Sequence, residues 1–163
     1  MKVLVAYGSK RGGTAGIAEM LGGDLVAEGM EVDVRSASEV KKVDGYDAVI
    51  VGGALYAMRW NKKSRRFVKH HKAALREKPV WFFSSGPLDE SATDHEIPET
   101  HQVHKLMERV HARGHVTFGG ALSPDAKGFP ASAMAKKNAG DWRDPEQIRA
   151  FAHEVAQAMA TTS

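Results

Sequence analysis

The amino-acid sequence predicts a doubly wound α/β fold, with a five-stranded parallel sheet in the order 2-1-3-4-5 and helices on both faces. Short apolar runs alternate with longer helical patterns along the chain. These runs are continuous, as in strands that are buried on both faces of a sheet. The first run leads through a glycine-rich turn directly into a helical pattern. In such folds, ligands bind at the carboxyl ends of the first and third strands.

The strands are recognised by their residue patterns. Residues 3–6 (VLVA), 48–51 (AVIV) and 80–83 (VWFF) are uninterrupted apolar runs. The second strand is short and alternating, with Val32 and Val34 on one face. The predicted strands span residues 2–7, 31–35, 47–52, 79–84 and 115–120.

Helical periodicity fills the intervals between these strands. Gly114 is expected to end the third long helix, and Asp144 with Pro145 predicts the N-cap and first turn of the last one. A short helical turn is expected at 40–42. Another short helix is expected around 131–138, inside a long connection that we expect to help cover the ligand crevice. The long helices are predicted at 13–28, 62–76, 99–113 and 145–160.

Length and composition predict one domain over residues 1–163, with the 42% hydrophobic content of an ordinary globular protein. The chain has no cysteine, which excludes disulfides, thiolate nucleophiles, iron–sulfur clusters and cysteine-bound zinc. The first residues run directly into a strand without a signal-peptide pattern, and no apolar run is long enough to span a membrane. The expected location is therefore the cytoplasm.

The chain is basic, with a formal net charge of +3 and an isoelectric point near 9.2. Much of this charge gathers on one predicted helix, where a solvated face is the simplest interpretation. A basic surface also favours anionic substrates or an anionic membrane surface, although nothing else in the sequence supports peripheral membrane contact. Nucleic acid is not an expected partner. The cluster comprises Arg59, Lys62, Lys63, Arg65, Arg66, Lys69 and Lys72.

The turn after the first strand has the composition of a phosphate cradle. Its backbone N–H groups and the positive end of the following helix dipole point at the same place, and its glycines allow close approach. Neither the Walker pattern nor the dinucleotide fingerprint is present, and a plain strand-to-helix turn without a ligand is the alternative. The candidate phosphate-binding residues are Ser9, Lys10, Arg11, Gly12, Gly13 and Thr14.

Ser9, Gly12 and Thr14 match the hydroxyl-rich loop with which flavodoxins hold the phosphate of FMN, whereas Arg11 stands where that family often has a hydroxyl. The resemblance implies FMN as the cofactor. The flat flavin ring then needs walls from the loops after the third and fourth strands. On one side we expect Ala54, Leu55, Tyr56 and Trp60, the two aromatics being loop residues that stack on the ring or pack on the protein's own surface. On the other side we expect Ser85, Gly86, Pro87 and Leu88 at the polar edge of the ring.

Four longer stretches extend the resemblance over nearly the whole chain. They are GGALYAMRWNKKSRRFVKHH, PVWFFSSGPL, FGGALSPDAKGF and GDWRDPEQIRAFAHEVA. Together they resemble the flavodoxin-domain proteins related to menaquinone-dependent protoporphyrinogen IX dehydrogenase. This resemblance implies a flavodoxin-like fold and an FMN-dependent oxidoreductase that passes electrons from a reduced substrate such as protoporphyrinogen to a quinone or a redox protein. The segment 123–143 is shorter and less basic than its counterpart in the dehydrogenase.

Two other functions stay open at this point. The chain could be a non-catalytic flavodoxin that carries electrons between protein partners, although such carriers are typically acidic. It could also be a binding module that has lost its cofactor. No residue stands out as a general base, so no catalytic residue is assigned; in flavin chemistry the cofactor itself carries the electrons or hydride.

A metal site is a further alternative, because His101 and His104 share one helical face and His111 and His115 follow. The apolar residues of this helix take its buried face, so we expect the histidines to lie on the surface without a metal. Their protonation between pH 5 and 8 would still change the charge of that face.

Overall fold

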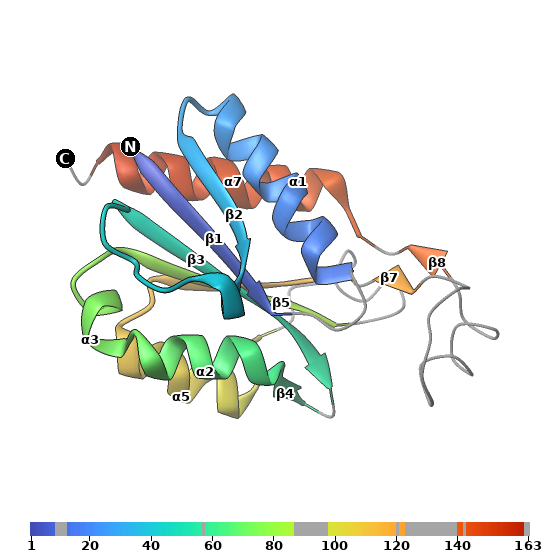
Figure 1. Cartoon of the computed structure of the whole chain (residues 1–163). Coiled ribbons are helices and arrows are strands. Elements are labelled where there is room, and N and C mark those ends of the chain that lie inside the picture. Colours follow the sequence, from blue (N-terminus) through green and yellow to red (C-terminus); the bar gives the residue numbers. More distant parts are fainter. Residues whose placement is uncertain are drawn as a thin grey trace.

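A computed structural model describes residues 1–8, 13–56, 58–86, 98–119, 121–122, 140–141 and 143–161, with the side chains of 56, 121–122 and 140–141 left out of the description. Its main sheet contains five parallel strands in the order β2-β1-β3-β5-β6, which confirms the predicted order (Figure 1). The strands are β1 (Lys2–Gly8), β2 (Glu31–Ser36), β3 (Ala48–Tyr56), β5 (Val80–Ser85) and β6 (Gly114–Phe118).

Three short strands complete the described sheets. Strand β4 (Arg59–Trp60) folds back antiparallel on the end of β3, pairing Leu55 with Trp60 and Tyr56 with Arg59. Strands β7 (Ala121–Leu122) and β8 (Gly140–Asp141) pair antiparallel as a separate ribbon.

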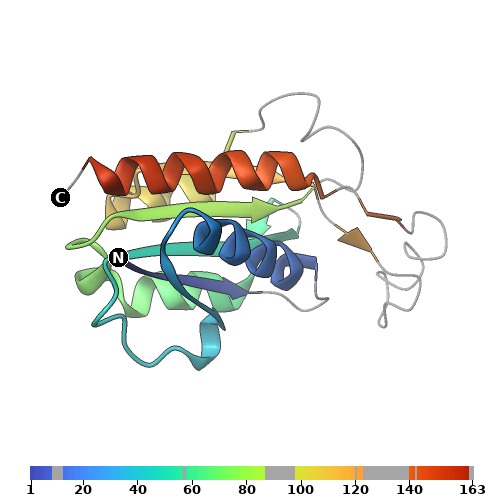
Figure 2. The same ribbon diagram turned by 90° about the horizontal axis from the view of Figure 1, so that it is seen from above.

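The helices cover both faces of the sheet (Figures 1 and 2). One layer holds α1 (Gly13–Ala27) and α7 (Pro145–Ala160), which pack against each other. The opposite layer holds α2 (Lys62–His70), α3 (Lys72–Leu75) and α5 (His101–Val110). A short 3₁₀ turn, η1 (Ala37–Glu39), lies beside α2.

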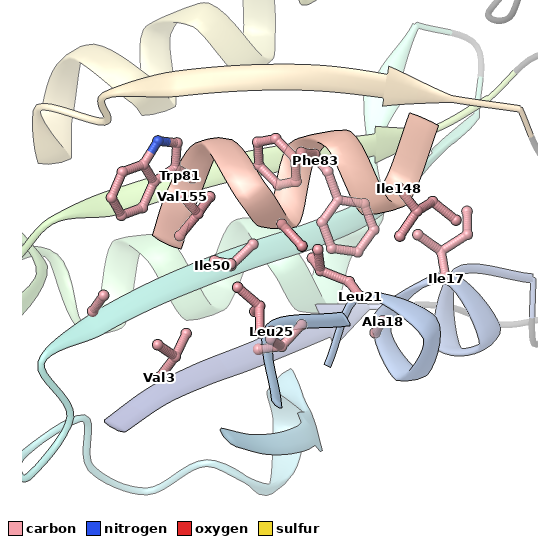
Figure 3. Packing of buried hydrophobic residues seen from close by; sticks show 14 of the residues in the cluster. Val3, Ile17, Ala18, Leu21, Leu25, Ile50, Trp81, Phe83, Ile148 and Val155 are labelled. Carbon is pink, nitrogen blue, oxygen red and sulfur yellow. The ribbon is translucent and has the colours of Figure 1, made fainter. Parts of the chain in front are cut away.

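Each face of the sheet carries its own hydrophobic core, which explains why the strands read as continuous apolar runs. Under α1 and α7, Val3 and Ile50 of the strands meet Leu21, Phe83 and Val155 (Figure 3). The neighbouring strand residues point the other way, because successive side chains of a strand alternate. They form the second core with the helices α2 and α5. Its members include Leu4, Val49, Phe67, Phe82 and Leu106.

Two predicted helices differ from the structure. The helix expected at 62–76 is two helices, because the backbone leaves helical geometry at His71 (φ −102°, ψ 17°), whose imidazole is buried. The turn expected at 40–42 is wrong; the observed 3₁₀ turn lies earlier, at Ala37–Glu39.

Two predicted boundaries also move. Strand β3 continues to Tyr56, where a loop was expected, because the hairpin with β4 supplies backbone partners to its last residues. Helix α5 ends at Val110 through a left-handed residue, His111 (φ 55°), so Gly114 begins β6 rather than stopping the helix. Asp144 caps α7 as expected, its carboxylate accepting from the Glu146 N–H. The helix expected at 131–138 lies outside the described residues.

Gly52→Ala is expected to destabilise the chain by roughly 1–3 kcal/mol, the usual cost of overpacking a filled core. A Cβ at Gly52 would overlap the ring of Phe83, which is fully buried. The matched control is Gly23→Ala in α1, where an added Cβ meets nothing within 4 Å and should stabilise the helix by about 0.5–1 kcal/mol. Urea unfolding measures both, and an unchanged midpoint for Gly52→Ala would show that the Phe83 ring moves aside freely.

Candidate functional site

The carboxyl ends of four parallel strands meet at one edge of the main sheet, where such folds bind ligands. The strand register places Gly8, Gly53, Ser84 and Thr117 in one row across β1, β3, β5 and β6. Ala54 and Ser85 pair directly in the next row. The structure therefore brings two of the predicted site residues, from opposite proposed walls, onto neighbouring strands.

The start of α1 lies at this same edge. Strand β1 ends at Gly8 and α1 begins at Gly13, so the predicted phosphate turn connects them. The first turn of α1 contains no acidic residue, and Thr14 is 1% exposed. The positive dipole end of α1 therefore lies at this edge, with no carboxylate in its first turn to repel an anion. Ser9, Lys10, Arg11 and Gly12 lie outside the described residues.

Glycines allow α2 to approach the strand ends. A Cβ at Gly8 would collide with the Ser64 hydroxyl and lie 2.8 Å from Asn61 Oδ1. A Cβ at Gly53 would lie 2.9 Å from both Ser64 Oγ and Trp60 Cδ1. Asn61 caps α2 by accepting from the Lys63 N–H at 2.9 Å. The beginning of α2 is thus in contact with the ends of β1 and β3. This role was not predicted from the sequence, although Gly8 and Gly53 directly follow the first and third predicted strands and were the available signal.

Arg143 is a second residue that sequence reasoning missed. It lies just before α7, and a Cβ at Gly16 would collide with its guanidinium. This cation therefore packs against the beginning of α1, close to the predicted phosphate turn. Its only sequence signal is its place between the Asp141-Trp142 pair and the N-cap Asp144.

The position of Trp60 differs from the prediction. It was expected as a loop aromatic beside the ligand, but its side chain is 1% exposed and packs against Phe82 with ring centroids 4.7 Å apart. Its indole N–H donates to Ser84 Oγ at 3.0 Å, its backbone N–H donates to Gln102 Oε1 at 2.8 Å, and its carbonyl accepts from Arg65 Nε at 3.1 Å. Trp60 thus anchors the β3–β4 hairpin from inside the core instead of forming an exposed wall.

The structure also describes several other residues of the two predicted walls. Leu55 is half-buried and packs on the core under α2 and α5, and Tyr56 is described only by its backbone pairing. Ser85 is buried, and the Gly86 N–H donates to the Phe118 carbonyl at 3.1 Å. Within the described part of the chain, the buried Thr117 Oγ1 beside them has no hydrogen-bond partner. Pro87 and Leu88 lie outside that part.

His115 extends the hydrogen bonds of Trp60 by one step. The Ser84 hydroxyl accepts from the indole and lies 2.8 Å from His115 Nε2, so its own proton can be donated to a neutral imidazole. Burial lowers the pKa of His115 to about 4, against the opposing attraction of the Glu99 carboxylate. His115 is therefore neutral at pH 7 and holds Ser84, which holds Trp60 and the hairpin.

The exposed His104 of α5 differs from His115. His104 is exposed and lies 2.9 Å from Glu99 and 2.8 Å from Glu108, and the Glu99 hydrogen bond raises its pKa. Among the residues that the structure describes, no three histidine, aspartate or glutamate side chains are placed to hold a metal ion. Over the same residues, no helix is both long and apolar enough to cross a bilayer.

Comparison with known proteins identifies a family. The family model described as flavodoxin domain matches residues 4–137, which is most of the chain. The protein named protoporphyrinogen IX dehydrogenase (quinone) from Escherichia coli K12 is 28% identical over 86 residues. That match covers 52% of this chain and 48% of the relative, so the chain spans about half the length of the curated relatives it matches. These findings confirm the resemblance seen in the sequence.

Solved structures agree on the fold. An archaeal flavodoxin superposes with a TM-score of 0.66 at 15% identity, covering 97% of this chain and 98% of its own. Flavodoxin 2 from Bacillus cereus gives 0.61 at 21% identity, covering 98% and 99%. The rubredoxin oxygen:oxidoreductase from Desulfovibrio gigas gives 0.67 at 15% identity, with 98% of this chain matching 36% of that one. At these identities the likeness shows the flavodoxin-like fold alone.

His115→Gln is expected to change the pH dependence of stability. The native pKa of about 4 lies below the ordinary 6.5, so the unfolded chain binds more protons and wild-type stability falls as the pH drops from about 6.5 to 4. This loss is on the order of 3 kcal/mol. Gln gains no proton and still accepts from Ser84, so the variant should lose less stability over this range.

Urea unfolding at pH 7.5 and 4.5 measures this difference. His101→Gln, at an exposed position of α5, is the control and should follow the wild type. If wild type and His115→Gln lose equal stability between the two pH values, the imidazole is not held neutral in the fold.

Proposed function

The chain belongs to the flavodoxin domain family, and we propose that it binds FMN at the carboxyl edge of its sheet and works as an FMN-dependent oxidoreductase. The observation that carries the proposal is the start of α1. It lies at the carboxyl edge of the sheet with an acid-free first turn, after a turn rich in hydroxyls and glycines. The family implies a flavin, and a helix N-terminus at the carboxyl edge of the sheet favours its phosphate.

The proposed phosphate site consists of Ser9, Lys10, Arg11, Gly12, Gly13 and Thr14. Its support is the helix dipole at Gly13, the buried position of Thr14 and the glycine at the end of β1. We add Arg143, because its guanidinium packs against the first residues of α1 at Gly16. An arginine there would supply the charge-assisted bonds that phosphates favour.

The proposed ring site lies between two walls. Ala54, Leu55 and Tyr56 form one, and Ser85, Gly86, Pro87 and Leu88 form the other. The pairing of Ala54 with Ser85 supports this arrangement, because adjacent strands lie about 4.8 Å apart. Thr117 offers a further buried hydroxyl beside Gly86. Trp60 is not part of the proposed walls. Together with Ser84 and His115, it would hold in place the hairpin that carries Tyr56.

FMN, when bound, would supply the redox chemistry by taking up electrons from a reduced substrate and passing them to an acceptor. The chain's own residues would bind the phosphate, orient the ring and keep water from its apolar face. The E. coli relative's name supports a substrate such as protoporphyrinogen and a quinone acceptor for this chain. We also propose that residues 1–163 form one domain, because the helices α1 and α7 from the two ends of the chain share one core.

An electron carrier without a substrate of its own is the second candidate. It is favoured by the solved flavodoxins, which this chain matches over 97% or more of its length and 98% or more of theirs. The two candidates share the cofactor and differ in whether an organic substrate is oxidised.

Thr14→Ala is expected to weaken FMN binding by about 1–3 kcal/mol, which corresponds to a 5- to 150-fold higher Kd. The variant removes a buried hydroxyl from the first turn of α1. Quenching of FMN fluorescence during titration measures the Kd. Thr161→Ala, at the exposed end of α7, is the control and should bind as the wild type does. Equal affinities for Thr14→Ala and wild type would exclude Thr14 from the site.

Turnover separates the two candidate functions. The FMN-loaded chain is expected to oxidise protoporphyrinogen with menadione as acceptor, and a sample stripped of FMN should not. Porphyrin fluorescence follows the product. Absence of turnover, together with rapid reduction of the chain by a flavodoxin reductase, would contradict the enzyme and favour the carrier.

A further inference from the structure

The positive charge of this chain comes from one segment. Residues 59–76 contain eight of the 23 basic residues and no acidic residue. The other 15 basic and 20 acidic residues give the rest of the chain a formal charge of −5. The basic isoelectric point therefore reflects a local concentration of cations on β4, α2 and α3 and not a uniformly basic surface.

Seven of these eight cations are exposed, and six of the seven form what we call the cationic face. Among the described residues, none of the six has a carboxylate within 4.0 Å, whereas Lys2 and Arg149 each pair with an acid. Arg65 and Arg76 are different, since Arg65 bonds to the Trp60 carbonyl and Arg76 lies 3.3 Å from His111. The cationic face consists of Arg59, Lys62, Lys63, Arg66, Lys69 and Lys72.

This arrangement works against the stability of the helix that carries it. Lys62 and Lys63 are the first two residues of α2, where the positive end of the helix dipole disfavours cations. Arg66 follows Lys62 by one helical turn, which places like charges side by side. The fold itself needs only the other side of α2, where Ser64, Phe67 and Val68 are buried. The cations therefore call for a reason outside the folded chain.

The cationic face begins beside the proposed FMN site. The first turn of α2 contacts Gly8 and Gly53 at the ends of β1 and β3. Figure 1 shows α2 starting next to β4 at the edge toward which the strands point. From there the nine residues of α2 extend the face by about 13 Å along the protein.

An apolar residue lies at the same end. Met58, next to Arg59 at the tip of the β3–β4 hairpin, is 71% exposed. Its backbone is left-handed (φ 67°), a conformation that a methionine rarely adopts. An exposed apolar side chain with a charged rim is the arrangement of a protein contact.

We propose that Met58 and the cationic face form the docking surface for an acidic redox protein that exchanges electrons with the proposed FMN. The inference rests on the proposed function and names its partner. Charge complementarity would steer the partner to the edge that holds the cofactor, where close approach allows electron transfer. In the direction tested, each reduced iron–sulfur cluster of the partner loses one electron, the FMN takes it up, and no covalent bond forms.

An anionic membrane is the less favoured partner. Stable membrane attachment combines a basic patch with substantial apolar insertion. Met58 is the one large apolar residue exposed at this end among the described residues; the two others, Met1 and Val26, lie on other elements. One methionine suits the small contact of a transient redox complex better than insertion into lipid.

A plant-type [2Fe–2S] ferredoxin, which is strongly acidic, is the probe. Calorimetry on the FMN-loaded chain should show binding that weakens at least tenfold when NaCl rises from 50 to 300 mM. Cytochrome c, a basic protein, should not bind under the same conditions. Stopped-flow mixing with reduced ferredoxin should show electron transfer with the same salt dependence.

Matched charge reversals test the position of the surface. Lys62→Glu, Lys63→Glu and Arg66→Glu together should weaken ferredoxin binding at least tenfold. Arg35→Glu, Lys105→Glu and Arg149→Glu change the net charge equally but are exposed on β2, α5 and α7, and should have a much smaller effect. Equal effects of the two triple variants would overturn the proposal, because net charge alone would then explain the binding.

Met58→Asn tests the apolar centre without risk to the fold, because asparagine tolerates a left-handed backbone. The variant should unfold at the same or a higher urea concentration and bind ferredoxin more weakly. Unchanged ferredoxin affinity would exclude Met58 from the surface. Binding to vesicles of phosphatidylglycerol and phosphatidylcholine, without binding to ferredoxin, would overturn the protein partner in favour of a membrane.

FMN absorbance is recorded for every sample, which separates the two proposals. A chain that takes up FMN but shows no salt-sensitive ferredoxin binding would contradict the docking surface alone. A chain that binds ferredoxin through the cationic face but takes up no FMN would contradict the proposed function alone.

Discussion

The architecture depends on the close approach of α2 to the ends of β1 and β3. Two glycines, Gly8 and Gly53, leave no Cβ between the strands and the first turn of the helix. The Ser64 hydroxyl uses this space to donate to the Gly52 carbonyl at 2.8 Å. The helix start is therefore fixed to the backbone of the sheet itself. The cations on α2 take their position relative to the sheet from this contact.

The second constraint is a set of hydrogen bonds that hold the hairpin from within. Trp60 has three polar groups, and each is satisfied by a side chain of a different element: Ser84, Gln102 and Arg65. A buried tryptophan whose indole N–H, backbone N–H and carbonyl are all hydrogen-bonded has little freedom to move. His115 adds a proton-dependent partner to this set through Ser84. The loop proposed as one flavin wall is thus supported through the buried Trp60, whereas the surface beside it is strongly charged.

The fold could be predicted from sequence because its signals are local and repeated. Continuous apolar strands, alternating helices and one glycine-rich turn were sufficient for the sheet order. Trp60 could not be placed correctly, because a tryptophan after a strand gives the same sequence pattern whether it covers a ligand or fills a core. Its burial depends on long-range contacts with Phe82, Ser84 and Gln102. The interruption of the predicted helix 62–76 at His71 was missed as well, because the neighbouring residues contain no helix-stop signal. Arg143 was missed because its contact with Gly16 joins segments that are far apart in the chain.

The packing of α1 against α7 affects how the chain is made. Ile17 and Leu21 of α1 are fully buried in a core that Ile148 and Val155 of α7 complete. On the ribosome, α1 emerges more than a hundred residues before α7. Before α7 is made, the strands β1, β2 and β3 are available to cover the apolar side of α1. The core that contains α1 is therefore complete only after the last helix has been synthesised.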